Sequence, residues 1–162
     1  MDAELEKRVR ECTARSELSA LARGFAALLD RRDFTAEGFA AVFTAGAVMT
    51  YPNGASAEGL DGIAELNAKM NGLFESTLSD VTNELVSFDG EDGALVSFHF
   101  TVTHKLIAPV AAQAPANLFI AHDVIYARAV LDGGTWKFTR LDMRGVYDHL
   151  EQSVEGPPIP KH

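Results

Sequence analysis

The chain has 162 residues, of which 47% are hydrophobic and 23% are charged. This length and composition are typical of one soluble globular domain and exclude a disordered or collagen-like chain. The formal net charge of −9 repels nucleic-acid phosphates and anionic membrane surfaces, so we expect no nucleic-acid or membrane partner.

Cysteine content and the N-terminal sequence indicate the cell compartment. Cys12 is the single cysteine, so an internal disulfide bond is impossible, and no cysteine–histidine cluster has the spacing of a zinc site. Residues 1–8 lack the apolar run of a signal peptide, and no stretch of about 18 apolar residues is present to cross a membrane. We therefore expect a cytoplasmic protein without a metal ion.

Helices are predicted in the first third of the chain. Hydrophobic residues recur at helical spacing over residues 18–29, and residues 5–12 either extend this helix or form a preceding one. Thr35, followed by Glu37, predicts the N-cap of a short second helix that ends at Gly46.

A short strand and a third helix follow. Residues 47–51 are β-prone, and the Pro-Asn-Gly sequence of residues 52–54 predicts a turn. Asp61 is the expected N-cap of the third helix, whose apolar stripe continues to about Glu75.

The second half of the chain predicts an antiparallel sheet of long strands. Aspartate- and glycine-rich turns predict tight hairpins at residues 89–93 and 132–134, and the prolyl segment 108–116 predicts a longer connection. The segments between these turns are rich in β-branched and aromatic residues, and they cover residues 81–88, 94–107, 117–131 and 135–147.

The order of these elements predicts the fold class. Helices followed by long antiparallel strands indicate an α+β fold in which the helices pack on one face of the sheet. We expect one domain over residues 1–152. The Pro-rich C-terminal tail, residues 153–162, cannot continue a helix or strand, and is expected to be disordered or to lie on a neighbouring subunit.

His104 is the first candidate functional residue. Alternation along its strand places it on the same face as Val96 and Phe98, whereas His99 is expected to face solvent. A histidine on an apolar face is either a hydrogen-bonded core residue or an acid–base group in a cavity, and both interpretations stay open.

Two further candidates lie at the ends of predicted elements. Asp30 is in the last turn of the first helix, where the helix dipole disfavours a carboxylate by up to about 1 kcal/mol. It is either a solvated helix end beside Arg31 and Arg32 or a pocket residue that orients a histidine. Tyr51 ends a short strand and is either structural or a hydrogen-bond donor into a cavity.

The pattern leaves the roles of His122 and Arg144 open. His122 lies in a strand that is apolar on both faces, so its direction is undecided. Arg144 alternates with apolar residues on the last strand, which is typical of a solvated outer face, but it is also suited to anchor an anionic or carbonyl group of a ligand.

The chemistry that these residues favour is acid–base catalysis. The sequence has no phosphate-binding loop, nucleotide fingerprint or nucleophile elbow. Histidine, aspartate and tyrosine in an apolar cavity are suited to elimination, isomerisation or cyclisation, and we expect no cofactor.

Several short segments, taken in order, carry a family resemblance: Leu-Leu-Asp-Arg-Arg-Asp-Phe at residues 28–34, Met-Thr-Tyr at 49–51, Val-Thr-His at 102–104, and Trp-Lys-Phe at 136–138 with Leu141 and Arg144 beyond. The chain resembles the SnoaL-like and scytalone-dehydratase-like branch of the nuclear-transport-factor-2-like (NTF2-like) superfamily over roughly residues 14 to 150. The resemblance implies a cone-shaped fold in which N-terminal helices pack on a curved, mostly antiparallel sheet around an apolar pocket. It also implies a homo-oligomer, a trimer or a dimer.

The resemblance implies site residues as well. The catalytic set would be His104 as the acid–base group, Asp30 as its orienting partner and Tyr51 as the polariser of a substrate carbonyl. The residues expected to bind the substrate are His122, Ser79, Phe25 and Arg144.

Ser79 is a departure from the family pattern. The usual catalytic histidine lies in a T-x-H-x-x-x-N-like segment, and residues 77–83 here have serine in its place. Serine cannot accept a proton near neutral pH. Either His104 with Asp30 has taken over the role of the base, or the chemistry is milder, or the pocket only binds a ligand.

Three functions follow as hypotheses. The leading one is a dehydratase, isomerase or cyclase that acts on a small hydrophobic oxygenated substrate, such as a polyketide- or terpenoid-like compound. The alternatives are a non-catalytic protein that binds a small hydrophobic ligand, and an interaction domain that assembles through its sheet face.

Overall fold

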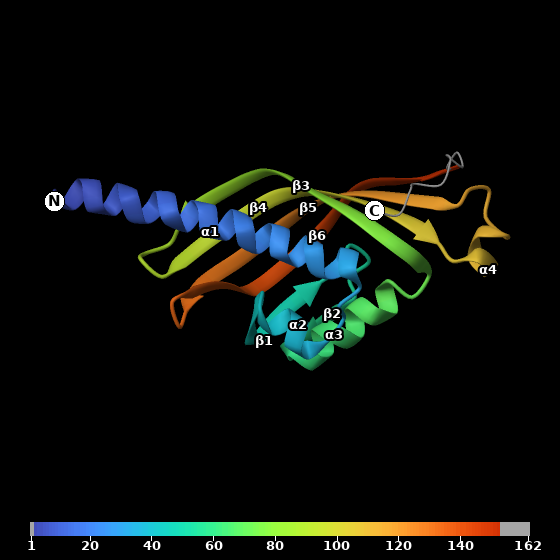
Figure 1. The fold of residues 1–162 in the computed structure, drawn as a ribbon, viewed down its shortest axis with the longest axis horizontal. Helices are drawn as coiled ribbons and strands as arrows, with labels where there is room; N and C mark the ends of the chain where they lie inside the picture. The colour runs from blue at the N-terminus through green and yellow to red at the C-terminus, as the bar shows by residue number, and fades with distance from the viewer. Residues whose placement is uncertain (1, 153–162) are drawn as a thin grey trace, which may run out of the picture.

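The computed structural model describes residues 2–152, which form helices followed by a long sheet. Figure 1 shows the first three helices lying on one side of the sheet, and the short fourth helix at one end of the strands. In chain order the elements are α1 (Ala3–Arg31), α2 (Ala36–Ala40), β1 (Phe43–Thr50), β2 (Ser56–Glu58), α3 (Gly59–Met70), β3 (Phe74–Phe88), β4 (Gly93–Leu106), α4 (Ala108–Ala111), β5 (Leu118–Asp132) and β6 (Thr135–Glu151).

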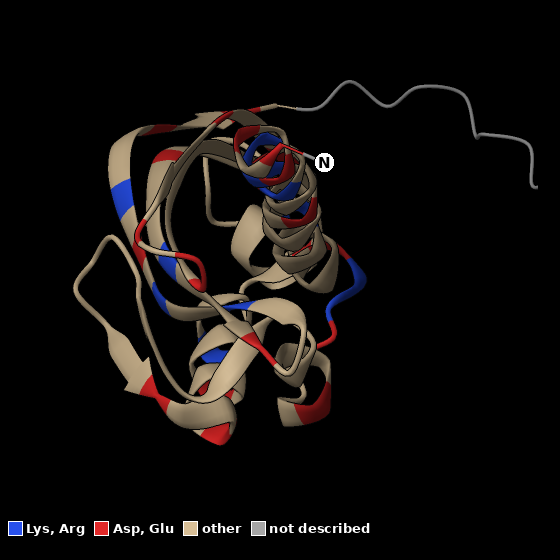
Figure 2. Cartoon of the chain, turned by 90° about the vertical axis from the view of Figure 1, so that its left-hand side faces the viewer, with Lys and Arg blue, Asp and Glu red and all other residues tan. Residues whose placement is uncertain are grey.

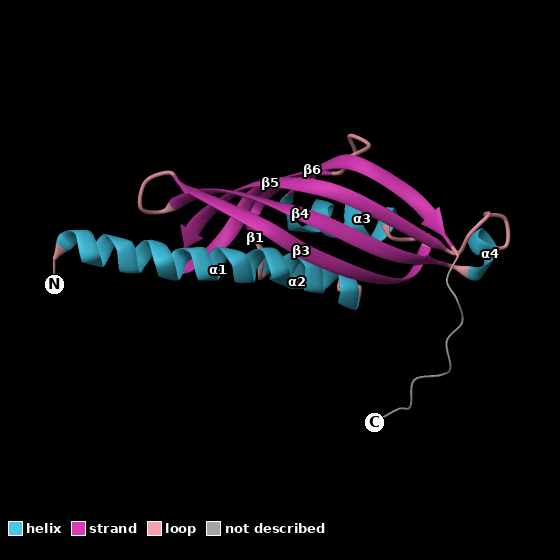
Figure 3. Ribbon diagram, turned by 90° about the horizontal axis from the view of Figure 1, so that it is seen from above, coloured by secondary structure: helices cyan, strands magenta, loops and turns pink. Residues whose placement is uncertain are grey.

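The six strands form one curved sheet in the order β2-β1-β6-β5-β4-β3. All neighbouring strands are antiparallel except β1 and β6, which are parallel. Figure 2 shows the sheet curling around the helices, and Figure 3 shows α1 running along the β3 edge. The predicted α+β architecture, with N-terminal helices packed on a curved and mostly antiparallel sheet, is confirmed.

The core lies between the concave face of the sheet and the helices. Phe25 of α1 is fully buried, and its ring packs against Phe43 and Phe100 with centroid separations of 5.9 and 6.0 Å. Phe138 extends this cluster from β6 through its contact with Phe43. The core therefore closes the narrow end of the cone, between α1 and the central strands.

Helix α1 is one continuous helix, so residues 5–12 extend the predicted first helix. The Asp2 side chain accepts a hydrogen bond from the Glu4 N–H and caps the N-terminus. The first turns project beyond the sheet (Figure 1) and carry charges of both signs (Figure 2). At the other end, Arg32 adopts a left-handed conformation with φ 57°, which turns the chain away from the helix axis.

Two predicted helix boundaries are wrong because strand pairing overrides local helical pattern. Thr35 does cap α2, but the helix ends at Ala40, since Phe43 already pairs with Phe138. Helix α3 ends at Met70 rather than near residue 75, because Phe74 pairs with β4.

Three further differences concern short elements. The position before α3 is Glu58, without a side-chain cap, and the expected cap Asp61 lies inside the first turn of the helix. Strand β2 and helix α4 are too short to have given a sequence signal. The predicted Pro-rich tail, residues 153–162, lies outside the described residues. Within residues 2–152, no helix combines the length and apolarity needed to span a bilayer.

Candidate active site

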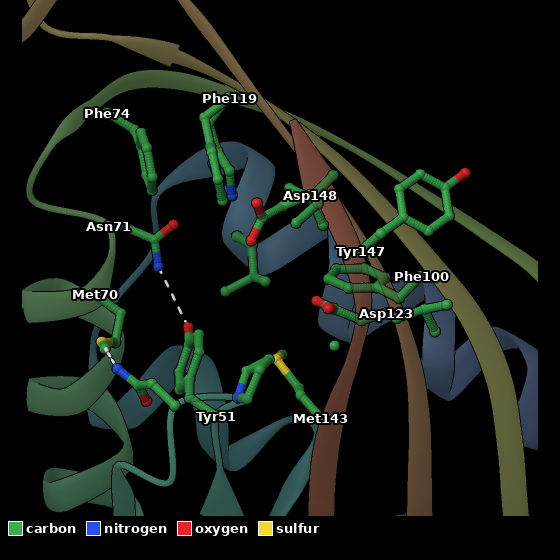
Figure 4. Close-up of a pocket in the computed structure, with 18 residues that line it drawn as sticks. Tyr51, Met70, Asn71, Phe74, Phe100, Phe119, Asp123, Met143, Tyr147 and Asp148 are labelled. Atoms are coloured by element: carbon green, nitrogen blue, oxygen red, sulfur yellow. Dashed lines mark hydrogen bonds between the residues drawn. The ribbon is translucent and has the colours of Figure 1, made fainter. Parts of the chain in front are cut away.

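A cavity of about 430 Å³ lies at the wide end of the cone, between the sheet, the end of α1 and the end of α3. Figure 4 shows its labelled side chains converging from α3, β1 and the central strands. The walls are mostly apolar or aromatic and contain a few polar groups. The lining residues are Leu29, Tyr51, Pro52, Asn53, Met70, Asn71, Phe74, Phe100, Val102, His104, Phe119, Ala121, Asp123, Met143, Gly145, Val146, Tyr147 and Asp148.

The alternation of side chains along β4 and β5 directs two titratable side chains, those of His104 and Asp123, toward this cavity. On β4, every second residue from Ala94 to Leu106 is buried, and His104 belongs to this inner set. Asp123 of β5 pairs with Phe100 of β4, so its side chain also faces inward. The prediction that His104 shares the apolar face of its strand is confirmed.

His104 is held in an aromatic setting. Its ring stacks on Phe74 with 3.9 Å between centroids and lies 6.0 Å from the ring of Phe119. Nδ1 shares a 2.9 Å hydrogen bond with Oγ1 of Thr77. Burial lowers the pKa of His104 to about 4, and the positive charge of Arg32 acts in the same direction. The imidazole is therefore neutral near pH 7.

Asp123 is the half-buried carboxylate of the cavity. Burial raises its pKa above the usual value, and the negative charge of Asp148 raises it further, while His122 acts in the opposite direction. A side chain on Gly145 would come within 3.6 Å of Oδ1 of Asp123 and within 3.4 Å of Pro52. Both distances are ordinary van der Waals contacts, so Gly145 lies directly beside the carboxylate at the cavity wall.

Tyr51 is fixed by Asn67 of α3 and by Asn71, which directly follows the last residue of that helix. Its hydroxyl donates to Oδ1 of Asn67 at 2.7 Å, and Nδ2 of Asn71 lies 3.4 Å from the same hydroxyl oxygen. Asn67 is 0% exposed, and its amide nitrogen donates to the carbonyl of Ile63 and contacts the sulfur of Met49. Burial raises the pKa of Tyr51 well above its usual value, so the phenol keeps its proton.

The family model described as a SnoaL-like domain matches residues 10–142. This chain belongs to the SnoaL-like domain family. No curated protein matches the SnoaL-like chain.

Solved structures share the fold of this SnoaL-like domain at low sequence identity. Kfla4162 from Kribbella flavida is 21% identical, with a TM-score of 0.76, covering 85% of this chain and 93% of its own. The hexachlorocyclohexane dehydrochlorinase LinA-type3 from Novosphingobium barchaimii is 16% identical, with a TM-score of 0.78 and coverage of 94% and 99%. A provisionally assigned scytalone dehydratase from Novosphingobium aromaticivorans is 18% identical, with a TM-score of 0.75 and coverage of 96% and 99%. The fold is the cone-shaped NTF2-like fold.

Asp30 and Ser79 of this SnoaL-like domain form hydrogen bonds with each other outside the cavity lining. The Ser79 hydroxyl donates to Oδ1 of Asp30 at 2.7 Å, and the Ser79 N–H donates to Oδ2 at 3.3 Å. Neither residue lines the cavity, and no hydrogen bond described within residues 2–152 joins Asp30 to His104. The expected orienting contact between Asp30 and His104 is therefore not formed.

Three residues expected to bind substrate lie elsewhere. Phe25 is in the core, behind the cavity. His122 points to the outer face of the sheet, where it stacks on Tyr147 at 4.2 Å. Arg144 is exposed, and its guanidinium lies 4.9 Å from the ring centroid of Tyr126. The positions of His122 and Arg144 follow from strand alternation, which turns the neighbours of an inward residue outward.

Sequence reasoning missed Asp123, Asp148 and Asn71. Asp123 follows His122 directly, so the alternation that turns His122 outward turns Asp123 inward. Because this strand is apolar on both faces, the sequence does not show which of its residues point inward. Asn71 comes after the end of α3, in a segment predicted to be helical. Among residues 2–152, no group of three or more His, Cys, Asp or Glu side chains is placed to hold a metal ion.

Proposed function

We propose that this SnoaL-like chain is a cofactor-independent acid–base enzyme, a lyase or an isomerase, for small, largely apolar oxygenated compounds. The observation that carries the proposal is that one apolar cavity holds Asp123, whose pKa is raised, and His104, whose pKa is lowered. When the pKa values of two titratable groups shift in opposite directions, one group can accept a proton while the other donates a hydrogen bond. Two structures that share the fold carry the names of a dehydrochlorinase and a dehydratase, which favours an elimination.

Asp123 is the base in this proposal. A carboxylate with a raised pKa is a stronger proton acceptor than a solvated one. The aromatic and aliphatic wall places this carboxylate in a mostly apolar setting. Asp123 takes the place of the His104–Asp30 pair expected from the sequence, since Asp30 is bound to Ser79.

His104 is the hydrogen-bond donor to the substrate carbonyl. In this role Oγ1 of Thr77 donates to Nδ1, and the single proton of the neutral ring is on Nε2. Because His104 lies four residues beyond Phe100, the strand partner of Asp123, the two side chains originate about 13 Å apart along the strands. The carbonyl group and its α-carbon lie between them in this proposal, with the oxygen toward His104 and the C–H bond toward Asp123.

The proposed reaction balances without an external oxidant or reductant. Asp123 removes a proton from the carbon next to a carbonyl, and the C–H electrons form an enolate whose oxygen accepts a hydrogen bond from His104. When the β-hydroxyl group leaves, Asp123 returns the proton to it, which releases water and forms a C=C bond. Return of the proton to a different carbon instead gives an isomer.

A panel of one- and two-ring β-hydroxy ketones tests this proposal. Loss of water is followed by mass spectrometry, and exchange at the α-carbon is followed in deuterium oxide. Asp123→Asn should slow both by at least about 100-fold. The matched control is Asp142→Asn, whose carboxylate pairs with Arg140 outside the cavity, and it should stay within about threefold of the native rate. Exchange that survives Asp123→Asn within about tenfold would remove Asp123 from the role of base.

A second candidate function is non-catalytic binding of a small hydrophobic ligand. The contact between Ser79 and Asp30 favours it, because serine cannot serve as a proton acceptor where relatives of the family have histidine. Native mass spectrometry of protein purified from its own host distinguishes the two. A ligand that is retained unaltered, together with no conversion of the panel, supports the binding protein.

A further inference from the structure

The direction of hydrogen bonds around Tyr51 determines what the cavity can recognise. Nδ2 of Asn67 donates to the backbone carbonyl of Ile63 at 2.8 Å, and a carbonyl oxygen can only accept. The amide of Asn67 is therefore oriented with Oδ1 toward Tyr51. Since Oδ1 also only accepts, the Tyr51 hydroxyl must direct its proton to Asn67, away from the cavity.

Asn71 is oriented by the same logic. Its Nδ2 donates to the backbone carbonyl of Asn67 at 2.9 Å and points toward the oxygen of Tyr51 at 3.4 Å. Figure 4 shows the amide oxygen of Asn71 on the opposite side, toward the cavity. Tyr51 and Asn71 therefore both present oxygen lone pairs to a ligand.

Two carboxylates complete this part of the wall. Asp123 and Asp148 face the cavity from β5 and β6 (Figure 4), and an ionised carboxylate only accepts hydrogen bonds. We use the term acceptor cluster for Tyr51, Asn71, Asp123 and Asp148. Of the lining side chains with N–H donors, His104 stacks on Phe74 at the start of β3, while Asn53 turns its amide nitrogen to Met70.

We propose that the acceptor cluster binds a hydrogen-bond donor of the ligand, a hydroxyl or amine group, and disfavours a carbonyl or carboxylate at that position. This inference rests on the proposed function, from which it takes an oxygenated substrate. It adds the place in the cavity where the hydroxyl group of that substrate lies. The lone pairs of a carbonyl oxygen placed there would face the lone pairs of the acceptor cluster and be repelled by them. The oxygens of the cluster would then lack a hydrogen-bond donor. A site built for a donor group discriminates strongly against an analogue that lacks it.

Binding of three matched probes tests the proposal without requiring turnover. The probes are 1-tetralol, its methyl ether and 1-tetralone, which share a two-ring skeleton and differ in whether the oxygen carries a proton. Titration is followed by protein NMR at about pH 8, where carboxylates are ionised. The alcohol should bind at least about tenfold more tightly than the ether and the ketone. Equal affinities, tighter ketone binding, or no saturable alcohol binding in the low-millimolar range would overturn the proposal.

A variant and its control place the effect at the cluster. Tyr51→Phe should reduce the preference for alcohol over ketone, whereas Tyr126→Phe, on the outer face of β5, should leave it unchanged. Tyr51→Phe leaves Oδ1 of Asn67 without a hydrogen-bond donor, so the NMR spectrum of the variant is used to check that it is folded. If the variant is unfolded, the proposal is decided by the three probes on the native chain. An unchanged preference in a folded Tyr51→Phe variant would contradict the role of Tyr51.

The two proposals fail separately. Alcohol preference without conversion of any β-hydroxy ketone supports the acceptor cluster and opposes the enzyme. Conversion by a chain with no alcohol preference supports the enzyme and opposes the acceptor cluster. Replacing 1-tetralol by 1-aminotetralin then separates the two donor types, since a tighter amine would show that the carboxylate charges contribute as well.

Discussion

The Ser79 hydroxyl lies 2.7 Å from Oδ1 of Asp30 and donates to it, while the Ser79 backbone N–H reaches the other carboxylate oxygen. This pair joins the last turn of α1 to β3. It provides hydrogen bonds for a carboxylate that the helix dipole disfavours at this end of α1. The relationship is therefore structural: Ser79 holds α1 against the edge of the sheet.

Ser79→Ala should consequently affect stability rather than catalysis. Loss of one hydrogen bond to a carboxylate is expected to lower the free energy of unfolding by about 1–2 kcal/mol. Urea denaturation measures this change, and Ser87→Ala, at an exposed position of the same strand, is the control. A Ser79→Ala variant that loses turnover while keeping its stability would show that Ser79 acts in the reaction.

Acid should destabilise the fold through His104. Its folded-state pKa, about 4, lies below the usual 6.5, so the unfolded chain takes up the proton first as the pH falls. The stability linked to this residue is complete above about pH 6.5 and is lost between about pH 6.5 and pH 4, by about 3 kcal/mol in total. Denaturation at a series of pH values measures the slope.

His104→Leu removes that titration and should flatten this part of the acid-side slope. His99→Gln, on the outer face of the same strand, retains His104 and should keep the native slope. If His104→Leu and the native chain lose stability in parallel below pH 6.5, His104 is not the group responsible.

Asp148 should influence the pH at which the proposed activity is lost in acid. Its charge raises the pKa of Asp123, so Asp148→Asn is expected to lower that pKa. The acid limb of kcat/KM against pH, where Asp123 becomes protonated, should then move to lower pH. The same limb in Asp142→Asn serves as the reference. An acid limb that moves to higher pH in Asp148→Asn would contradict the proposed repulsion.

Self-association is expected through the outer face of the sheet. Leu78, Leu85 and Tyr126 are 65%, 63% and 47% exposed on strands β3 and β5, and burial of these apolar side chains against a second copy would favour association. We expect a dimer or trimer at micromolar concentration by light scattering. Leu85→Glu should shift the mass toward that of a monomer, whereas Leu131→Glu, in a hairpin, should not. A native chain that is monomeric at this concentration would rule out the expected assembly.

Much of the fold follows from periodicity in the sequence. The stripe along residues 18–29 identified the buried face of α1, and alternation on β4 correctly turned His104 inward and His99 outward. These patterns are readable because each element has one buried and one exposed face. The ends of α2 and α3 were wrong because pairing of Phe43 and Phe74 in the sheet outweighs local helix propensity.

The candidate site was only partly accessible from the sequence. Tyr51 and His104 line the cavity as expected. Asp123 stayed hidden because apolar residues on both faces of β5 remove the alternating signal that fixes the phase of a strand. The contact between Asp30 and Ser79 joins residues 49 positions apart, and such pairings depend on how α1 lies across β3. Local pattern contains no information on that placement.

Asn67 does not line the cavity, yet it sets the direction of the Tyr51 hydroxyl by accepting its hydrogen bond. A side chain that donates a hydrogen bond to Tyr51 from this buried position would direct the Tyr51 hydroxyl proton toward the cavity. The same phenol would then polarise a carbonyl. One substitution behind the wall would thus add a hydrogen-bond donor to a cluster that otherwise only accepts. Substrate preference among chains of this fold can therefore diverge while every residue in contact with the substrate is retained.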